Sequence, residues 1–373
     1  MLLMMAEVLH FRRMAERFEA SRVWQFLADC QTHVAWTGCS PHDLIQPSFA
    51  FLVGVALPFS LASRTARGQS TARMALHAVW RSVALVALGI ALRYWLRPAR
   101  VITFEDTLTQ IGLGYVPLFF LGRARNLIRF VALIAILVGY WALFALRPLP
   151  GADFDWGAVG VPPDWSYHFS EFAAHWNKNA NPAWAFDVWF LNLFPRAAAF
   201  THNAGGYTTL NFIPTLGTMI LGLFAGSWLM ADASARSKVG RLLLAGVATL
   251  SIGLFLDAAG ICPAVKRIWT PSWVLVSGGA CFLILAGLFT VIDWAELRRW
   301  TMPLCVIGAN SIAAYVLAEW TRLIVIPWLI SWRWSGFAMF GAGFEPLFAG
   351  AVLLTADWLV LYLLYRRRIY LRI

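Results

Sequence analysis

Long runs of apolar residues alternate with short polar segments along almost the whole chain of 373 residues. A run of about 17–23 apolar residues is long enough to cross the hydrocarbon core of a bilayer as a helix. The pattern therefore predicts membrane-spanning helices near 44–63, 74–96, 107–122, 127–147, 209–231, 240–258, 270–292, 302–317 and 346–365. The predicted fold class is all-α, a polytopic transmembrane helical bundle that forms a single domain over residues 1–373.

Two apolar segments do not fit a simple span. Residues 318–333 are interrupted by Arg322 and Pro327, which indicates a partial, interfacial or re-entrant helix, or a further full span. Residues 1–9 are too short to cross a membrane and lack the cleavage site of a signal peptide, so we expect the end of a truncated first helix. With that helix, the bundle has about ten or eleven helices.

The charge distribution fits a multi-pass membrane protein better than a nucleic-acid-binding protein. Only 13% of the residues are charged, against about 25% in ordinary soluble domains. The net charge of +11 comes largely from short basic clusters between apolar runs, as the positive-inside rule predicts for cytoplasmic loops. These clusters are Arg64, Arg67, Arg73; Arg123, Arg125, Arg129; Arg236, Lys238, Arg241; Arg298, Arg299; and Arg366, Arg367, Arg368, Arg372.

This orientation places the predicted loops 12–43 and 148–208 on the extracytoplasmic side. The loops are mostly short, and no Asn-x-Ser/Thr sequon is present, which favours a bacterial inner membrane. Membrane lipids are expected partners, a homodimer is one assembly open to the chain, and nucleic acid is not expected. No internal repeat is visible, which counts mildly against the inverted-repeat transporter folds.

The most informative polar segment runs from Thr32 to Leu44 and leads directly into an apolar helix. It carries His33 and Asp43, ten residues apart. Titratable groups at a membrane boundary are costly to hold there and are candidates for function. A histidine can act as a general base while a carboxylate orients its other nitrogen. The alternative is a structural loop histidine that is hydrogen-bonded to the backbone.

Other polar residues lie within or beside predicted spans. Arg81, near the cytoplasmic end of its span, is a candidate for binding a cofactor phosphate. Asn310 and Ser311 place polar groups inside an apolar span, either as ligand contacts or as polar contacts between helices. Lys266 and Trp269 stand where a cation and an aromatic ring could hold a substrate, although interfacial anchoring is the commoner explanation.

Several other functions lack support in the sequence. The five cysteines show no CxxC spacing and no histidine at metal-ligand spacing, so no metal site is predicted. Cys30 and Cys39 could form a disulfide only in an oxidising compartment. No P-loop, GxGxxG, HExxH or GxSxG motif is present, which leaves nucleotide hydrolysis and serine-hydrolase chemistry unsupported.

The order of these motifs resembles the heparan-alpha-glucosaminide N-acetyltransferase family and its bacterial relatives. The family's His-x-x-Trp-x-Gly and Asp-Leu-x-x-Pro patterns are matched by His33-Val34-Ala35-Trp36-Thr37-Gly38 and Asp43-Leu44-Ile45-Gln46-Pro47. Three further stretches resemble family motifs in the same order: Lys266-Arg267-Ile268-Trp269-Thr270-Pro271-Ser272-Trp273, Gly308-Ala309-Asn310-Ser311-Ile312 and Tyr365-Arg366-Arg367-Arg368-Ile369. The resemblance implies acetyl-CoA as the cytoplasmic acyl donor and a sugar amine as the acceptor across the membrane. It also implies that His33 is the active-site histidine and Asp43 its neighbouring acid.

The chain departs from the family pattern at two motifs. The Ser-x-Asp-x-x-Arg-Gly motif of the family's first helix is absent, and the arginine of a second motif is replaced by Gln110. The 148–208 segment also differs in composition, so acceptor specificity does not carry over.

We therefore predict a membrane acyltransferase that moves an acetyl or similar acyl group from cytoplasmic acetyl-CoA to an amine or hydroxyl of an extracytoplasmic sugar or glycan. His33 and Asp43 are the predicted catalytic residues. Arg81, Asn310 and Ser311 are predicted to hold acetyl-CoA, and Trp36, Lys266 and Trp269 to contact the acceptor. The alternatives are a transporter or flippase for a glycan or lipid-linked sugar, and a non-catalytic membrane scaffold.

Overall fold

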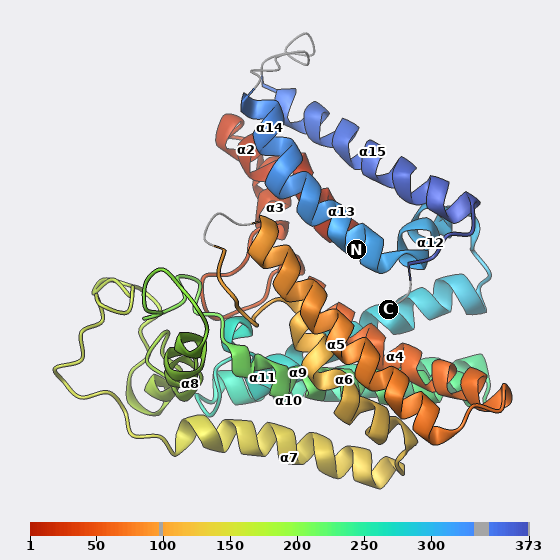
Figure 1. The fold of residues 1–373 in the computed structure, drawn as a ribbon, viewed down its shortest axis with the longest axis horizontal. Helices are drawn as coiled ribbons and strands as arrows, with labels where there is room; N and C mark the ends of the chain where they lie inside the picture. Colours follow the sequence, from red (N-terminus) through yellow and green to blue (C-terminus); the bar gives the residue numbers. More distant parts are fainter. Residues whose placement is uncertain (97–99, 332–342, 372–373) are drawn as a thin grey trace.

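The computed structural model describes residues 1–96, 100–331 and 343–371, and within these ranges the regular secondary structure is helical. No strand occurs in the described part, where the only extended pairing is an isolated bridge between Thr37 and Val265. Figure 1 shows the helices in two groups: α4 to α7 and α9 to α11 lie together, while α13 to α15 lie beside the short N-terminal helices. The all-α prediction is confirmed.

The long helices follow the predicted apolar runs closely. They are α4 (Ile45–Ala66), α5 (Thr71–Leu96), α6 (Thr107–Arg123), α7 (Asn126–Ala145), α9 (Phe212–Met230), α10 (Ala235–Ala258), α11 (Pro271–Phe289) and α15 (Glu345–Arg366). Among the described residues, seven helices are long and apolar enough to cross a membrane, or eight if one bent pair counts as a span. These helices support an integral, multi-pass membrane protein.

The centre of the bundle is the crossing of α4 and α9. A Cβ atom built on Gly54 would lie 1.9 Å from the carbonyl oxygen of Met219, and one built on Gly222 would lie 1.9 Å from that of Phe51. Small residues at such a crossing let two backbones approach closely, which strengthens packing where no hydrophobic effect acts between helices. α9 is consequently the most enclosed of the candidate spans.

The span predicted near 302–317 is not one continuous helix in the structure. The chain forms α12 (Met302–Ala309) and α13 (Ser311–Trp320), and the two helical segments are bent by 76°. The break lies at Asn310, whose φ of −127° and ψ of 49° are not helical. Apolar content alone predicts that a segment is helical, but a polar residue that bonds elsewhere can interrupt it.

Beyond α13, the predicted short apolar stretch 318–333 continues as a π-helical turn, Thr321–Val325, and α14 (Ile326–Ser331). It therefore extends the bent span; residues 332 and 333 lie outside the described residues, as does Arg372 of the C-terminal basic cluster.

The N-terminal region contains more helix than its polarity suggests. Residues 1–9 form α1 (Leu2–Met5) and the 3-10 helix η1 (Ala6–Leu9). The connector 12–43, predicted as an extracytoplasmic loop, contains most of α2 (Phe11–Arg17) and all of α3 (Arg22–Cys30).

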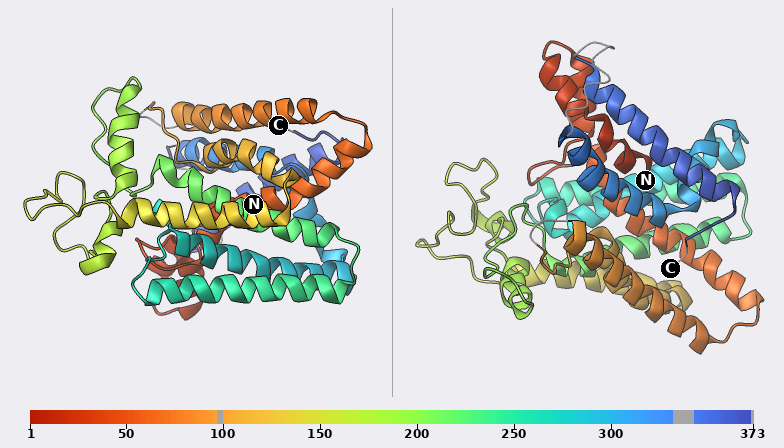
Figure 2. Two further views of the ribbon diagram at one scale, coloured as in Figure 1. Left: turned by 90° about the horizontal axis from the view of Figure 1, so that it is seen from below. Right: turned by 45° about the horizontal axis from the view of Figure 1, so that its top comes forward.

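By contrast, the 148–208 segment is largely irregular, and it contains no candidate membrane span, as predicted. It contains the short helices η3 (Glu171–Trp176), α8 (Pro182–Phe190) and η4 (Leu191–Leu193). Figure 2 shows this segment projecting beyond one end of the helical bundle.

Candidate functional site

Trp36 anchors the loop that carries His33. Its side chain is completely buried, its indole Nε1–H donates to the backbone oxygen of Trp176 over 3.2 Å, and its ring meets Trp165 edge-on. Gly38 follows with a φ of +103°, a conformation that glycine adopts without strain. Trp36 was expected to contact the acceptor, but the structure places it in an aromatic core beneath the loop.

A capping box then positions Asp43. Ser40 Oγ accepts the backbone N–H of Asp43 over 3.3 Å, and Asp43 Oδ2 accepts the backbone N–H of Ser40 over 3.1 Å. Pro41 begins the 3-10 helix η2 (Pro41–Leu44) that leads into α4. This reciprocal arrangement satisfies backbone donors at a helix start and holds the carboxylate rigidly.

His33 and Asp43, singled out by the sequence, meet in the structure. Nδ1 of His33 lies 2.7 Å from Oδ1 of Asp43, while Oδ2 of Asp43 also accepts the backbone N–H of Val34 over 3.2 Å. Asp43 is fully buried, whereas the side chain of His33 is 40% exposed. A histidine held by a buried carboxylate through one nitrogen can exchange a proton through the other.

Lys266 completes this cluster. Its Nζ lies 3.1 Å from Oδ1 of Asp43 and 3.0 Å from Nδ1 of His33, and its side chain is only 5% exposed. The residue lies in the 3-10 helix η6 (Lys266–Ile268), far from both partners in sequence. Lys266 was expected on the acceptor side, and the structure adds that it pairs directly with the carboxylate.

The hydrogen on His33 Nδ1 follows from these three contacts. Nδ1 cannot donate to Asp43 and accept from Lys266 at the same time. The carboxylate is the closer partner and the stronger acceptor, so Nδ1–H donates to Asp43, and Lys266 donates to the same carboxylate. Nε2 of His33 is then the nitrogen that can take a proton.

Electrostatics keep His33 neutral. Burial lowers the pKa of His33, and the nearby positive charge of Lys266 lowers it further. The hydrogen bond to Asp43 raises the pKa, but by less, so the pKa of His33 is lowered overall. Burial also lowers the pKa of Lys266, although Asp43 acts in the opposite direction. A histidine that is neutral near pH 7 has a lone pair for base catalysis.

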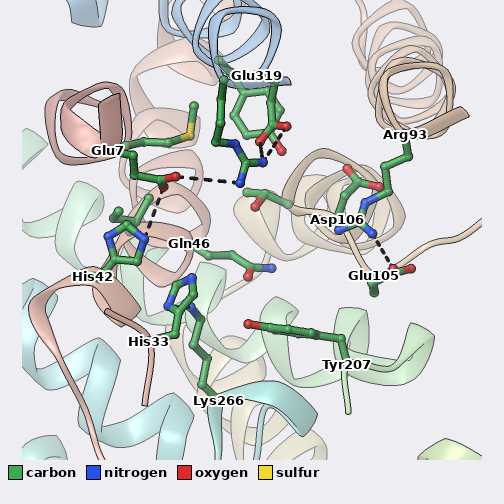
Figure 3. A pocket seen from close by; sticks show the side chains of 15 residues that line it. Glu7, His33, His42, Gln46, Arg93, Glu105, Asp106, Tyr207, Lys266 and Glu319 are labelled. Atoms are coloured by element: carbon green, nitrogen blue, oxygen red, sulfur yellow. Dashed lines mark hydrogen bonds and ion pairs between the residues drawn. The ribbon is translucent and has the colours of Figure 1, made fainter. Parts of the chain in front are cut away.

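These residues open into a cavity of about 230 Å³, drawn in Figure 3. The cavity is rich in charged side chains that pair with one another: Glu7 with His42, Arg322 with Glu319 and with Glu7, and Arg93 with Glu105. Its lining residues are Met4, Glu7, His33, His42, Ile45, Gln46, Arg93, Glu105, Asp106, Thr107, Tyr207, Lys266, Tyr315, Glu319 and Arg322.

Glu7, Glu319 and Tyr207 line this site without having been predicted to do so, and no role was predicted for His42. These residues come from separate segments, and no spacing along the chain brings them together. The one available signal was charge inside apolar sequence, as at Arg322 and Glu319, which indicates a polar cavity in a membrane protein.

A second polar cavity, of about 370 Å³, contains Arg81. Four of its residues are basic and three are serines: Arg64, Arg67, His77 and Arg81, with Ser60, Ser63 and Ser311. Nη1 of Arg81 donates to the hydroxyl of Tyr115 over 3.2 Å, while its buried Nε has no partner within the described residues. Clustered arginines with a free donor suit an anion such as a phosphate.

Two of the three predicted cofactor residues, Arg81 and Ser311, share this cavity. The third, Asn310, does not line it. Asn310 is fully buried, its amide donates to the backbone oxygen of Ile369 over 3.0 Å, and its Oδ1 accepts the N–H of Leu371 over 2.9 Å. Asn310 therefore holds the C-terminal segment and interrupts the helix.

Trp269, expected to contact the acceptor, is likewise internal. It is 1% exposed, and its indole N–H donates to Oγ1 of Thr218 on α9 over 3.2 Å. Its position fixes η6, which carries Lys266, against the bundle.

The two polar cavities lie along the same pair of helices. α5 contributes Arg81 to the basic cavity and Arg93 to the His33 cavity, and α13 contributes Ser311 and Glu319 in the same order. A narrow cavity of about 30 Å³, lined by Leu92, Arg93, Tyr315 and Glu319 among others, lies between the same helices. The twelve residues from Arg81 to Arg93 correspond to about 18 Å along a helix.

Comparison with known proteins extends the picture. The chain matches no protein-family model. Human heparan-alpha-glucosaminide N-acetyltransferase is 25% identical over 401 residues, which cover 95% of this chain and 57% of that protein. The mouse protein of the same name is 23% identical over 395 residues, which cover 95% of this chain and 58% of that protein. The chain is related to this family.

The resemblance to heparan-alpha-glucosaminide N-acetyltransferases that the motifs indicated is therefore confirmed. The likeness covers 95% of this chain. The chain nevertheless spans less than three-fifths of the length of either N-acetyltransferase.

Proposed function

We propose that this protein is a membrane acyltransferase that moves an acetyl group from acetyl-CoA to an amine or hydroxyl of an extracytoplasmic sugar. The observation that carries the proposal is the His33–Asp43–Lys266 cluster, with its 2.7 Å and 3.1 Å contacts at the edge of a polar cavity. The kinship with N-acetyltransferases supports the same reaction.

The basic cavity suits the donor. Arg64, Arg67 and Arg81 carry the positive charge that the phosphates of CoA require, and Ser311 adds a hydroxyl. The positive-inside pattern assigns this end of the bundle to the cytoplasm. The narrow cavity between α5 and α13 shares Arg93 and Glu319 with the His33 cavity.

The chain's own residues then supply base catalysis. Nε2 of His33 takes the proton of the acceptor nitrogen or oxygen as that atom bonds to the acyl carbon, and then returns the proton to the departing sulfur. Asp43 holds the ring in one orientation and stabilises the imidazolium. The same nitrogen could instead carry the acyl group transiently, and the geometry fits either route.

Acetyl transfer by purified protein in detergent tests this proposal. Radiolabelled acetyl-CoA and glucosamine are supplied to the parent, to His33→Ala and to His168→Ala, which removes a histidine outside the cavity. We expect loss of transfer by at least about 100-fold in His33→Ala only, as is typical for removal of a catalytic base. Equal transfer by the parent and His33→Ala would overturn the proposal.

A transporter or flippase for a glycan is the competing function, because two polar cavities in one helical bundle also suit alternating access. Binding of acetyl-CoA separates the two. A ligand that binds only the folded protein raises its melting temperature by mass action, and a transporter has no reason to bind CoA.

A further inference from the structure

A second histidine–carboxylate pair lies in the His33 cavity. Nε2 of His42 is 3.2 Å from Oε1 of Glu7, and the two residues come from η2 and η1. The rings of His33 and His42 have centroids 4.4 Å apart and planes tilted by 50°. Figure 3 shows both histidines and Glu7 around the same cavity.

Glu7 is the carboxylate partner of His42. The imidazole is 7% exposed. Arg322 approaches the other oxygen of Glu7 at 3.8 Å, but it is neutralised by a closer carboxylate, Glu319, at 2.8 Å. Glu7 therefore retains negative charge for His42, whereas Asp43 is already paired with Lys266.

An amine acceptor requires two deprotonations. Near neutral pH an aliphatic amine is largely an ammonium ion, which has no lone pair. It must lose one proton before it attacks a carbonyl carbon and a second as the amide forms. A hydroxyl loses only one. A single histidine that passes its proton to the departing sulfur can accept only one of these two protons. The other proton needs a second acceptor.

Building on the proposed acyl transfer, we propose that His42, held by Glu7, takes the first proton from an ammonium acceptor. With its Nε2–H donating to Glu7, His42 takes this proton at Nδ1 and becomes an imidazolium. The neutral amine nitrogen then bonds to the acyl carbon of the thioester while the C–S bond breaks. His33 moves the second proton to the sulfur, and His42 later releases the first to water.

Because the two rings lie close together, protonation of His42 affects the later proton transfer by His33. A charge on His42 makes His33 give up its proton more readily, because two positive charges at this separation repel. Lys266 acts in the same direction. The other charged or titratable groups that line the cavity around the two histidines are Glu7, Arg93, Glu105, Asp106, Tyr207, Tyr315, Glu319 and Arg322.

The test compares amine and hydroxyl acceptors across pH. Acetyl transfer to methyl glucosaminide and to methyl glucoside is measured from about pH 6 to about pH 9 in the parent, His42→Gln and Glu7→Gln. We expect both variants to lose transfer to the amine by about 100-fold at the acidic end. They should recover most of it at the alkaline end, where the amine is already neutral, and change little with the hydroxyl.

Glu16→Gln is the control, because it removes an exposed carboxylate that pairs with Arg12 outside this cavity. Its ratio of amine to hydroxyl transfer should follow that of the parent at every pH. If His42→Gln does not fold, Glu7→Gln, which retains the imidazole, decides the matter.

Two results would overturn the inference. If a variant loses acetyl transfer to both acceptors equally at every pH, the His42–Glu7 pair has a structural role. If the parent acetylates only the hydroxyl acceptor, the proposed acyl transfer holds, but His42 has no ammonium proton to accept. A parent that transfers to neither acceptor would overturn the proposed function itself.

Discussion

At the scale of single residues, the state of His33 depends on which partner holds its Nδ1. Asp43 and Lys266 are both within hydrogen-bond distance of this atom, at 2.7 Å and 3.0 Å. The Asp43 carboxylate accepts hydrogen bonds from both His33 and Lys266, so Nε2 of His33 remains available. The positive charge of Lys266 also helps to keep the pKa of His33 low. Lys266 therefore controls the pH range in which His33 works.

Replacing Lys266 with methionine should move this range. Burial lowers the pKa of His33 and Lys266 lowers it further, so loss of the lysine raises it. We expect the acidic limb of kcat/KM to move toward higher pH, and a pKa raised by about 1 would lower activity on that limb about tenfold. Lys178→Met, which removes a lysine that contacts Trp165 outside the cavity, should keep the parent profile. An unchanged limb in Lys266→Met would contradict this assignment.

Arg81 offers a test of the donor side alone. Arg81→Gln removes a guanidinium with a free Nε from the basic cavity. Since a hydrogen bond to a charged group contributes about 1.5–3 kcal/mol, the Kd for acetyl-CoA should rise about tenfold or more. Titration calorimetry measures this directly. Arg125→Gln, a change in a neighbouring basic cluster that does not line the cavity, should bind as the parent does.

At the scale of helices, close crossings hold the spans that carry the site. α4 begins at the capping box that positions Asp43, and α9 crosses it at Gly54 and Gly222. The break at Asn310 has a comparable effect on α13, because the amide that leaves the helix instead holds Ile369 and Leu371. Helix positions in this bundle are thus determined by small and polar residues as much as by apolar ones.

A pair of glycine substitutions tests the crossing. Gly222→Ala places a methyl group against the backbone of α4 and should destabilise the protein by about 1–3 kcal/mol, as overpacking usually does. Gly240→Ala meets nothing within 4 Å and should leave stability unchanged or slightly higher. Thermal unfolding in detergent, followed by helical circular dichroism, compares them. Equal melting temperatures would show that the crossing tolerates wider separation.

At the scale of the whole molecule, the 148–208 segment is tied to the bundle through Asp187. This carboxyl, on α8, is buried and accepts the backbone N–H of Thr209, just before α9, over 3.0 Å. Burial raises the pKa of Asp187 to about 7 in spite of this hydrogen bond. The folded protein therefore binds a proton here more tightly than the unfolded chain does.

It follows that stability should fall as pH rises through about 4 to 7, because the unfolded chain loses this proton before the folded protein does. Asp187→Asn retains an oxygen acceptor and cannot ionise, so its melting temperature should fall less between pH 5 and pH 8. Asp164→Asn, an exposed carboxyl in the same segment, should behave as the parent. If the melting temperature of Asp187→Asn fell with pH as much as that of the parent, Asp187 would not be the group that causes the fall.

The sequence by itself determined what short-range physics controls. Apolar runs of bilayer length predicted the long helices, and the resemblance and chemistry of the His33–Asp43 motif identified the pair that meets at 2.7 Å. Only the tertiary structure decided which distant groups surround that pair. Lys266 lies 223 residues from Asp43, Glu7 comes from the first turns of the chain, and Trp36 and Trp269 turn inward. Helix packing determines such contacts, and burial in the packed bundle then shifts the pKa values.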